Sequence, residues 1–228
     1  STGIFSLEPD FFSFIRENDL TDAVGAFIES GKKLRAVPAD DWQDAVYPWD
    51  LLQMNQKLIP SAPPEKAGEV SGTSVIQGQV RIGKGSRVGP GTCIFGPVVI
   101  GPGCEIGPHA CIMPFSSIGA RVRIEPYTVV ENTILMDDCE VGSHSRVKDA
   151  VIGEGVHLED HVSTVTTAPL MEIQGEQIKG RFGAILGEKV RAGPFTTFEG
   201  AIVGNSVRIG GGSRLRSTTA YEDGGLVV

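Results

Sequence analysis

Residues 70–130 read VSGTSVIQGQVRIGKGSRVGPGTCIFGPVVIGPGCEIGPHACIMPFSSIGARVRIEPYTVV. An aliphatic side chain returns at every sixth position of this stretch, at Val70, Ile76, Ile82, Val88, Ile94, Ile100, Ile106, Ile112, Ile118, Ile124 and Val130. Neither the 3.6-residue period of an α-helix nor the two-residue period of a strand produces this spacing. A six-residue period is typical of hexapeptide repeats, in which three hexads complete one triangular coil of a parallel β-helix. We therefore predict a mainly β protein whose aliphatic side chains point inward.

The repeat continues beyond this stretch with small shifts in phase. Five-residue steps, such as the step from Val130 to Leu135, lie three hexads apart and are expected on the same face of successive coils. The repeat is interrupted at residues 166–181, where a loop is expected to leave the coil. Between residues 70 and 219 the pattern predicts about seven coils, which form a prism about 30–35 Å long at the usual strand spacing.

The first sixty residues follow another pattern, with short apolar elements of both kinds. Strands are expected at residues 2–7 and 34–38, and helices at residues 8–17, 21–30 and 48–58. So short a segment buries only a small core, so we interpret residues 1–59 as the C-terminal tail of a larger α/β domain. Residues 60–69, PSAPPEKAGE, are a linker by composition. Residues 70–228 then form the β-helix, with the protruding loop at 166–181.

Charge and hydropathy argue against several classes of protein. The formal net charge is −8, and no basic field of the kind that binds nucleic acid is present. No run reaches the roughly 18 apolar residues of a membrane span. The first ten residues lack the basic start and apolar stretch of a signal peptide. We therefore expect a cytoplasmic protein that binds neither nucleic acid nor membrane.

The cysteines argue against a zinc site. Cys93, Cys104, Cys111 and Cys139 lack the CxxC spacing of zinc ligands. Cys93 and Cys111 are one coil apart, so a disulfide between them is the alternative to reduced thiols. A cytoplasmic location favours reduced thiols.

Four short pieces in the first sixty residues carry a resemblance to a known family. They are TGIF at 2–5, NDLTDA at 18–23, WQD at 42–44 and PWDLL at 48–52. In this order they resemble the end of the catalytic domain of sugar-1-phosphate nucleotidylyltransferases. With the hexapeptide repeat behind them, the chain resembles the C-terminal half of archaeal-type bifunctional enzymes. That family includes glucose-1-phosphate thymidylyltransferases and N-acetylglucosamine-1-phosphate uridylyltransferase/acetyltransferases.

The resemblance implies a left-handed coil, although ordinary parallel crossovers are right-handed. It also implies a homotrimer, and an intact enzyme that acts on a sugar phosphate and a nucleoside triphosphate with Mg²⁺. Asp44, in WQD, matches a carboxylate that binds a second Mg²⁺ in relatives. One carboxylate does not hold Mg²⁺ alone, and the family's nucleotide loop and first metal-binding Asp belong to the front half. We therefore expect no nucleotidyl transfer by this chain alone, with Asp44 a solvated loop acid.

Acetyl transfer from acetyl-CoA is the second activity that the resemblance implies. In such relatives a His acts as general base towards the amine of a sugar phosphate. The matching hexad here is residues 141–146, where Ser143 takes the position of the base and Arg146 that of a family Tyr. A serine without a base of its own is a poor proton acceptor. The substitutions therefore argue against acetylation of glucosamine 1-phosphate.

A periodic set of rings lies close to that hexad. His109, Tyr127, His144 and His161 are spaced by 18, 17 and 17 residues, so they are expected to stack one coil apart, about 5 Å from one another. In one interpretation His144 replaces the missing base, with Glu159 and Asp160 as acids that orient it. In the other, the rings form a stripe where three prisms meet.

Basic residues gather in and after the interruption of the repeat. Lys179, Arg181, Lys189 and Arg191 are candidates, together with His161, to bind the phosphates of CoA or of a sugar phosphate. The alternative is a hairpin whose charges serve solubility. Three functions remain open from the sequence: the rear of a nucleotidylyltransferase trimerised by its β-helix, an acyltransferase of altered specificity, and a non-catalytic scaffold.

Overall fold

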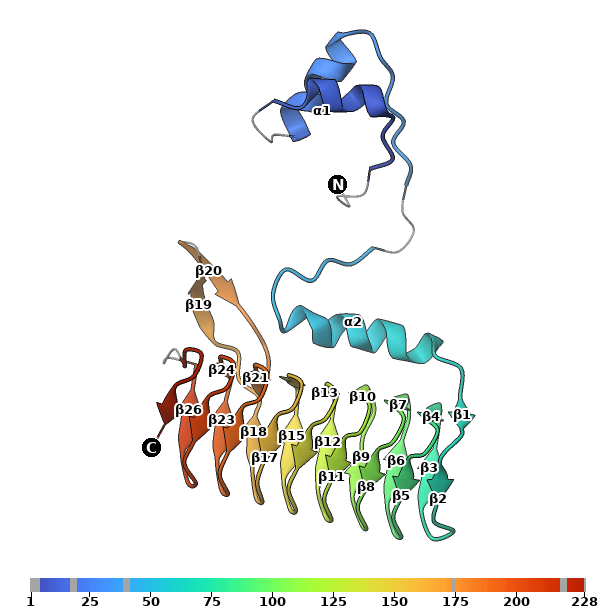
Figure 1. The fold of residues 1–228 in the computed structure, drawn as a ribbon, viewed down its shortest axis with the longest axis vertical. Helices are drawn as coiled ribbons and strands as arrows, with labels where there is room; N and C mark the ends of the chain where they lie inside the picture. The colour runs from blue at the N-terminus through green and yellow to red at the C-terminus, as the bar shows by residue number, and fades with distance from the viewer. Residues whose placement is uncertain (1–4, 17–19, 39–41, 174, 218–220, 228) are drawn as a thin grey trace. The chain divides into compact units, whose positions relative to one another are not determined.

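The computed structural model describes residues 5–16, 20–38, 42–173, 175–217 and 221–227. The chain forms two units, Ser1–Asp44 and Ala45–Val228 (Figure 1). Among the described residues, none of the helices has the length and apolar character needed to cross a membrane.

The first unit has a small aromatic core. A 3₁₀-helix, η1 (Pro9–Phe14), packs on α1 (Leu20–Glu29). The ring of Phe27 lies 5.1 Å from that of Phe11 and 5.3 Å from that of Phe14. The second expected helix is thus confirmed within one residue at each end, whereas the first is a shorter 3₁₀-helix that begins at Pro9.

The strands expected in this unit are not found. Residues 34–38 have no regular structure, and neither have residues 5–7; the start of the other expected strand, residues 1–4, lies outside the described residues. A strand needs a partner to satisfy its backbone groups. The described part of this unit contains no sheet that could supply one.

The second unit is a parallel β-helix of three sheets. The first sheet contains β1 (Glu65–Lys66), β4 (Val80–Ile82), β7 (Val98–Ile100), β10 (Ser116–Ile118), β13 (Ile134–Leu135), β16 (Ala150–Ile152), β21 (Ala184–Leu186) and β24 (Ala201–Val203). The second contains β2 (Glu69–Val70), β5 (Arg87–Val88), β8 (Glu105–Ile106), β11 (Arg123–Ile124), β14 (Glu140–Val141), β17 (His157–Leu158), β22 (Arg191–Ala192), β25 (Arg208–Ile209) and β27 (Leu226–Val227). The third contains β3 (Val75–Gln77), β6 (Cys93–Phe95), β9 (Cys111–Ile112), β12 (Val129–Glu131), β15 (Arg146–Lys148), β18 (Ser163–Val165), β23 (Thr197–Glu199) and β26 (Arg214–Arg216).

The six-residue period determines the register of all three sheets. Ile106 pairs with Val88 on one side and with Ile124 on the other, so like positions of successive coils stack. The aliphatic positions are buried in one continuous core that runs through the coils. The prediction of inward-pointing aliphatic ladders is confirmed.

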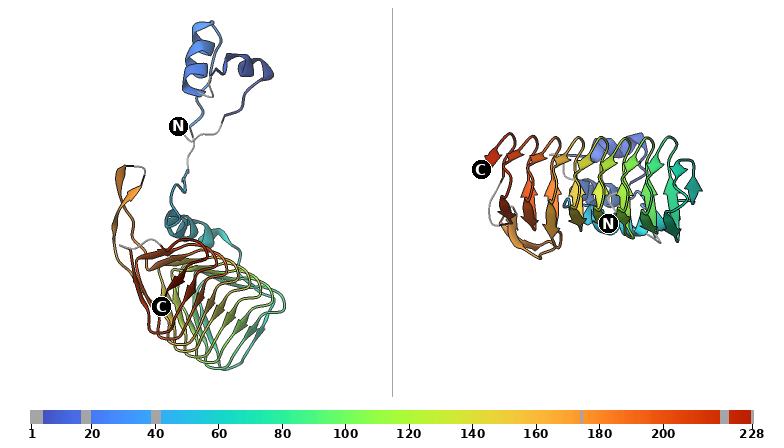
Figure 2. Two further views of the ribbon diagram at one scale, coloured as in Figure 1. Left: turned by 60° about the vertical axis from the view of Figure 1, so that its left-hand side comes forward. Right: turned by 90° about the horizontal axis from the view of Figure 1, so that it is seen from below.

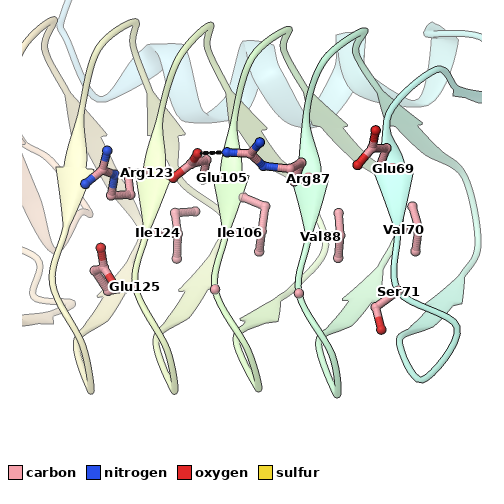
Figure 3. Close-up of a pocket in the computed structure, with 12 residues that line it drawn as sticks. Glu69, Val70, Ser71, Arg87, Val88, Glu105, Ile106, Arg123, Ile124 and Glu125 are labelled. Carbon is pink, nitrogen blue, oxygen red and sulfur yellow. Dashed lines mark hydrogen bonds and ion pairs between the residues drawn. The ribbon is translucent and has the colours of Figure 1, made fainter.

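The coil is left-handed. In Figure 3 the strand nearest the viewer runs downward from Glu69 to Ser71, and successive coils advance to the left from Val70 to Ile124. A chain that descends in front while it advances to the left winds as a left-handed helix. The handedness expected from the family resemblance is confirmed.

The β-helix is longer than the seven coils predicted. Its sheets contain eight, nine and eight described strands. At one end, β1 lies within the segment interpreted as a linker, residues 60–69, and β2 begins at its last residue; at the other end, β27 lies beyond residue 219. These end strands are held by backbone pairing to β4, β5 and β25. In β1 the residue in register with Ile82 is Lys66, so the backbone pairing continues there without an aliphatic side chain.

A helix and a hairpin cover part of the first sheet. The helix α2 (Asp50–Leu58) agrees with the helix expected at residues 48–58. It packs on β16, and Asn55 Nδ2 donates a hydrogen bond of 2.8 Å to the carbonyl oxygen of Phe115. The boundary between units is therefore at Asp44, not at residues 59–60 as the sequence suggested. The interruption at 166–181 forms an antiparallel hairpin, β19 (Leu170–Ile173) with β20 (Glu176–Lys179), that leaves the stack of coils (Figures 1 and 2).

The four cysteines are free thiols in two environments. Cys104 and Cys139 are fully buried in the core, whereas Cys93 and Cys111 pair in register and are partly exposed. Burial raises the pKa of the Cys139 thiol to about 11, and burial also raises the pKa of Cys104.

We expect the two pairs of thiols to react with alkylating reagents at very different rates. At pH 8 only about one Cys139 side chain in a thousand is the reactive thiolate, and it is also shielded from reagent. Cys93 and Cys111 should be modified in the folded protein. Cys104 and Cys139 should be modified at least about a hundred times more slowly, until denaturant is added. Mass spectrometry of peptides after timed alkylation measures this, and equal rates at all four sites would contradict the register of the coils.

Candidate functional site

Five stacked rings form the most ordered feature of the surface, and we call them the aromatic column: His109, Tyr127, His144, His161 and Phe195. Successive ring centroids are 5.2, 5.0, 5.1 and 4.7 Å apart, and successive ring planes are within 9° of parallel. All five side chains are exposed. The predicted spacing of about 5 Å is thus confirmed.

The aromatic column follows a corner of the prism. The sequence had suggested that it lies on a flat face. Its members connect the second sheet to the third, and all have φ between 56° and 60°. Their backbone N–H groups bond to the previous coil, as His144 does to the carbonyl oxygen of Pro126 at 3.1 Å. A left-handed conformation costs a residue other than glycine roughly 1–2 kcal/mol. Stacking of neighbouring rings offsets part of this cost.

Phe195 was missed in the sequence because the hairpin hides its spacing. It lies 34 residues after His161, twice the usual 17, yet β18 pairs directly with β23 and places the two rings in adjacent coils. The protruding segment accounts for the additional residues. If the protruding segment had been left out of the count, the same corner position in the next coil would have been found at Phe195.

The surroundings of His144 do not make it a prepared general base. Its ring lies between those of Tyr127 and His161, at 5.0 and 5.1 Å. Asp160, expected to orient it, instead accepts the backbone N–H of Ser143 at 2.7 Å. Among the described residues, no carboxylate forms a hydrogen bond or an ion pair with the imidazole of His144. Glu159, the other acid expected to orient it, is no exception.

The remaining residues of the predicted catalytic set point elsewhere. Arg146 lies on β15 of the third sheet and pairs with Glu131 at 3.9 Å, while Lys148 also binds Glu131, at 2.9 Å. Ser143 belongs to the corner that follows β14 and lines a groove beside the second sheet with Asp160. The structure therefore brings Ser143 and His144 together but turns Arg146 to another face.

The outer face of the second sheet has a ladder of alternating charges (Figure 3). In register, its outward positions are Glu69, Arg87, Glu105, Arg123, Glu140, His157, Arg191 and Arg208. Glu105 pairs with Arg87 and, at 3.6 Å, with Arg123. His157 Nδ1 lies 2.5 Å from a carboxylate oxygen of Glu140. Opposite charges on neighbouring strands stabilise the sheet.

The alternation fails at the C-terminal end of this ladder. Arg191 pairs directly with Arg208 in the parallel register, so two like charges face each other. No acid within the described part of the chain forms an ion pair with either of them. They line an open groove of about 570 Å³, together with Pro194, Gly210 and Glu159 among others. Like charges placed in this way destabilise a sheet unless an anion lies between them.

The basic cluster predicted from the sequence is divided between two places. Lys179 ends β20 and Arg181 follows it, so both belong to the base of the hairpin. Lys189 lies at the corner between the first and second sheets, and Arg191 faces outward from the second sheet. His161, predicted to share a binding site with them, is a member of the aromatic column.

Asp44 gives no support to a metal site. It lies at the end of the first unit and is exposed. Among the described residues no group of three His, Cys, Asp or Glu side chains is placed to hold a metal ion. The described residues therefore provide no set of ligands for Mg²⁺.

Comparison with known proteins places the chain in a family. Residues 94–220 match the family described as the GMPPB C-terminal domain. The Bifunctional protein GlmU of Methanococcus aeolicus is 30% identical over 230 residues, covering 92% of this chain and 55% of that protein. GlmU of Methanococcus maripaludis strain C7 is 33% identical over 227 residues, with the same coverage. The chain therefore spans about half the length of these curated relatives.

Among solved structures, UDP-N-acetylglucosamine O-acyltransferase (LpxA) of Moraxella catarrhalis has 16% identity and a TM-score of 0.39, over 74% of this chain and 66% of that one. A likeness of this size supports no statement about function. The match over residues 94–220 covers more than half of the chain and lies within the part that forms the hexapeptide coils. The chain belongs to the family of the GMPPB C-terminal domain.

Proposed function

We propose that the enzyme containing this chain makes a nucleotide sugar from a sugar 1-phosphate and a nucleoside triphosphate, with Mg²⁺, and that the β-helix holds its subunits together. The observation that carries the proposal is the alignment of 92% of the chain with GlmU proteins at about 30% identity. A cytoplasmic location with reduced thiols belongs to the same proposal. Phosphoryl chemistry of this kind depends on positioning and on charge stabilisation of the phosphates.

The proposal is tested on the gene product that contains this chain. We expect pyrophosphate release from UTP or dTTP with at least one sugar 1-phosphate in the presence of Mg²⁺. The 228-residue chain alone should release none, because its described residues hold no group of three metal ligands, and the resemblance assigns the nucleotide loop to the front half of such enzymes. Failure of the gene product with every sugar 1-phosphate would refute the proposal. Turnover by this chain alone would refute the expectation that nucleotidyl transfer needs the rest of the enzyme.

Assembly as a trimer is part of the proposal. The four rings from His109 to His161 lie exposed along one corner, which suits a contact between copies related by cyclic symmetry. Light scattering should give a mass three times the 24.2 kDa of one chain at micromolar concentration. Tyr127→Glu, at the second position of the column, should lower that mass, whereas Phe12→Glu, an exposed phenylalanine of the first unit, should not. A monomeric wild type would contradict the trimer.

A second candidate function is transfer of an acyl group from acetyl-CoA to an amino sugar. It is favoured by the exposed imidazole of His144, which directly follows Ser143, the residue at the position that matches the family's base. The missing orienting acid argues against it. A general base contributes roughly 10²–10⁴-fold to rate, so we expect at most residual activity.

The assay for this function is thiol release from acetyl-CoA with a panel of amino sugars. We expect wild type and His144→Ala to release thiol at the same low rate. His109→Ala, which removes another ring of the same column, is the matched control. Robust release that is lost in His144→Ala and kept in His109→Ala would establish acyl transfer with His144 as its base.

A further inference from the structure

The two ends of the aromatic column differ. At the N-terminal end the corner position of the preceding coil is Gly91, and the ring of His109 lies against its backbone: a Cβ on Gly91 would be 2.5 Å from the imidazole. At the C-terminal end the next corner position is Gly212. A Cβ on Gly212 would meet nothing within 4 Å. The column is therefore closed at one end and open at the other.

Gly212 occupies the same structural position as the five rings. Thr197 pairs with Arg214, so Phe195 and Gly212, each two residues earlier, are equivalent in adjacent coils. The N–H of Gly212 donates to the carbonyl oxygen of Pro194 at 2.8 Å, as the N–H of Phe195 does to Asp160 at 3.0 Å. The φ of Gly212 is 76°. The coil that contains Gly212 therefore has the same corner as the coils of the aromatic column, but no ring at that position.

The last ring of the column lies unprotected beside this empty position. Phe195 is 63% exposed, a large fraction for a phenylalanine. Another planar ring placed over Gly212 would continue the stack at the spacing already used by five side chains. Stacking of a nucleobase on an aromatic side chain strengthens binding by roughly 5- to 150-fold.

Two unpaired cations lie on the strands just before this corner. Arg208 is four residues before Gly212, at most about 14 Å along an extended chain, and Arg191 faces Arg208 across the register. Pro194 lines their groove and connects it to Phe195 in the sequence. Guanidinium groups bind phosphate oxygens well. One acid, Glu159, also lines the groove, so the two arginines outnumber it.

We propose that the C-terminal coils bind a nucleoside phosphate, with its base over Gly212 against Phe195 and its phosphates between Arg191 and Arg208. The open end of the stack suits a planar group, and the facing arginines suit an anion. A nucleotide carries both in one molecule. The site rests on neither nucleotidyl transfer nor acyl transfer, so its failure would leave the proposed function untouched.

Isothermal titration calorimetry at low salt tests the site with separated parts of the ligand. The probes are ADP and UDP, adenosine without phosphate, and inorganic pyrophosphate without a base. We expect adenosine and pyrophosphate each to bind at least about tenfold more weakly than ADP. Pyrophosphate that binds as tightly as ADP would reduce the site to a bare anion site and overturn the proposal.

Four variants separate the two halves of the site. Phe195→Ala should weaken ADP at least about fivefold and leave pyrophosphate unchanged, whereas Arg208→Gln should weaken both. Gly212→Phe should place a sixth ring in the open position and abolish ADP binding. It should fold, because rings at five equivalent corners adopt φ of 56–60°. Arg87→Gln is the matched control, since Arg87 lies on the same sheet but is paired with Glu105.

A separate comparison identifies which compound supplies the nucleoside phosphate. Coenzyme A that binds at least tenfold more tightly than ADP, and responds to the same variants, would identify it as the ligand. Equal or weaker binding would assign the site to a free nucleotide or a nucleotide sugar. ADP affinity that is unchanged in both Phe195→Ala and Gly212→Phe would overturn the proposal. The proposal would also be overturned if the wild-type protein bound no nucleotide and Phe195→Ala changed the oligomeric mass. That result would mean that a second copy of the chain covers the corner.

Discussion

Ile106→Asp should lower the free energy of unfolding by about 4 kcal/mol or more, enough to leave the β-helix unfolded near its working temperature. Ile106 is 2% exposed and stacks between Val88 and Ile124 in the core. A carboxylate there has no cation or hydrogen-bond donor among its aliphatic neighbours. The cost is that of an unpaired charge removed from water. Thermal and denaturant unfolding, followed by circular dichroism, measure it.

The matched control for this change is Ile202→Asp. Ile202 is also an isoleucine in a strand of the β-helix, but its side chain faces outward and is exposed. Its carboxylate stays in water, so the loss should be about 1 kcal/mol or less. Similar losses at both positions would show that strand propensity, and not burial of charge, causes the effect. A stable Ile106→Asp variant would refute the inward register.

The register could be predicted because it depends on local spacing alone. Each coil repeats the same three turns, so an aliphatic side chain six residues after another meets the same environment. The same logic predicted the stacking of His109, Tyr127, His144 and His161. Spacing does not distinguish a flat face from a corner, however. The corner became visible only in the left-handed φ of these residues.

Contacts that skip the repeat could not be predicted in this way. Phe195 joins the aromatic column across an insertion, and Arg191 meets Arg208 rather than Lys179 because the hairpin turns away from the second sheet. The packing of α2 on the first sheet is a long-range contact that helical periodicity cannot indicate. The same holds for β1, which pairs with β4 although it has no aliphatic side chain.

The second large effect is expected at the place where these non-repeating parts meet. Phe182 is fully buried and stacks on Trp49 with ring centroids 5.3 Å apart. With Leu52 of α2 and Val151 and Ile185 of the first sheet, they form an apolar cluster separate from the main core. Met171 and Ile178 of the hairpin pack against it. The cluster therefore attaches both the helix and the hairpin to the β-helix.

Phe182→Ala should destabilise this attachment by about 3–5 kcal/mol, the usual cost of a phenylalanine removed from a packed site. Because the cluster is separate from the main core, the loss should be local. Hydrogen exchange should rise in α2 and in β19–β20 while β8 and β11 remain protected. Leu170→Ala, which truncates an exposed side chain of the same hairpin, is the control and should change neither. Uniformly faster exchange through all coils in Phe182→Ala would show instead that the cluster and the main core unfold as one cooperative unit.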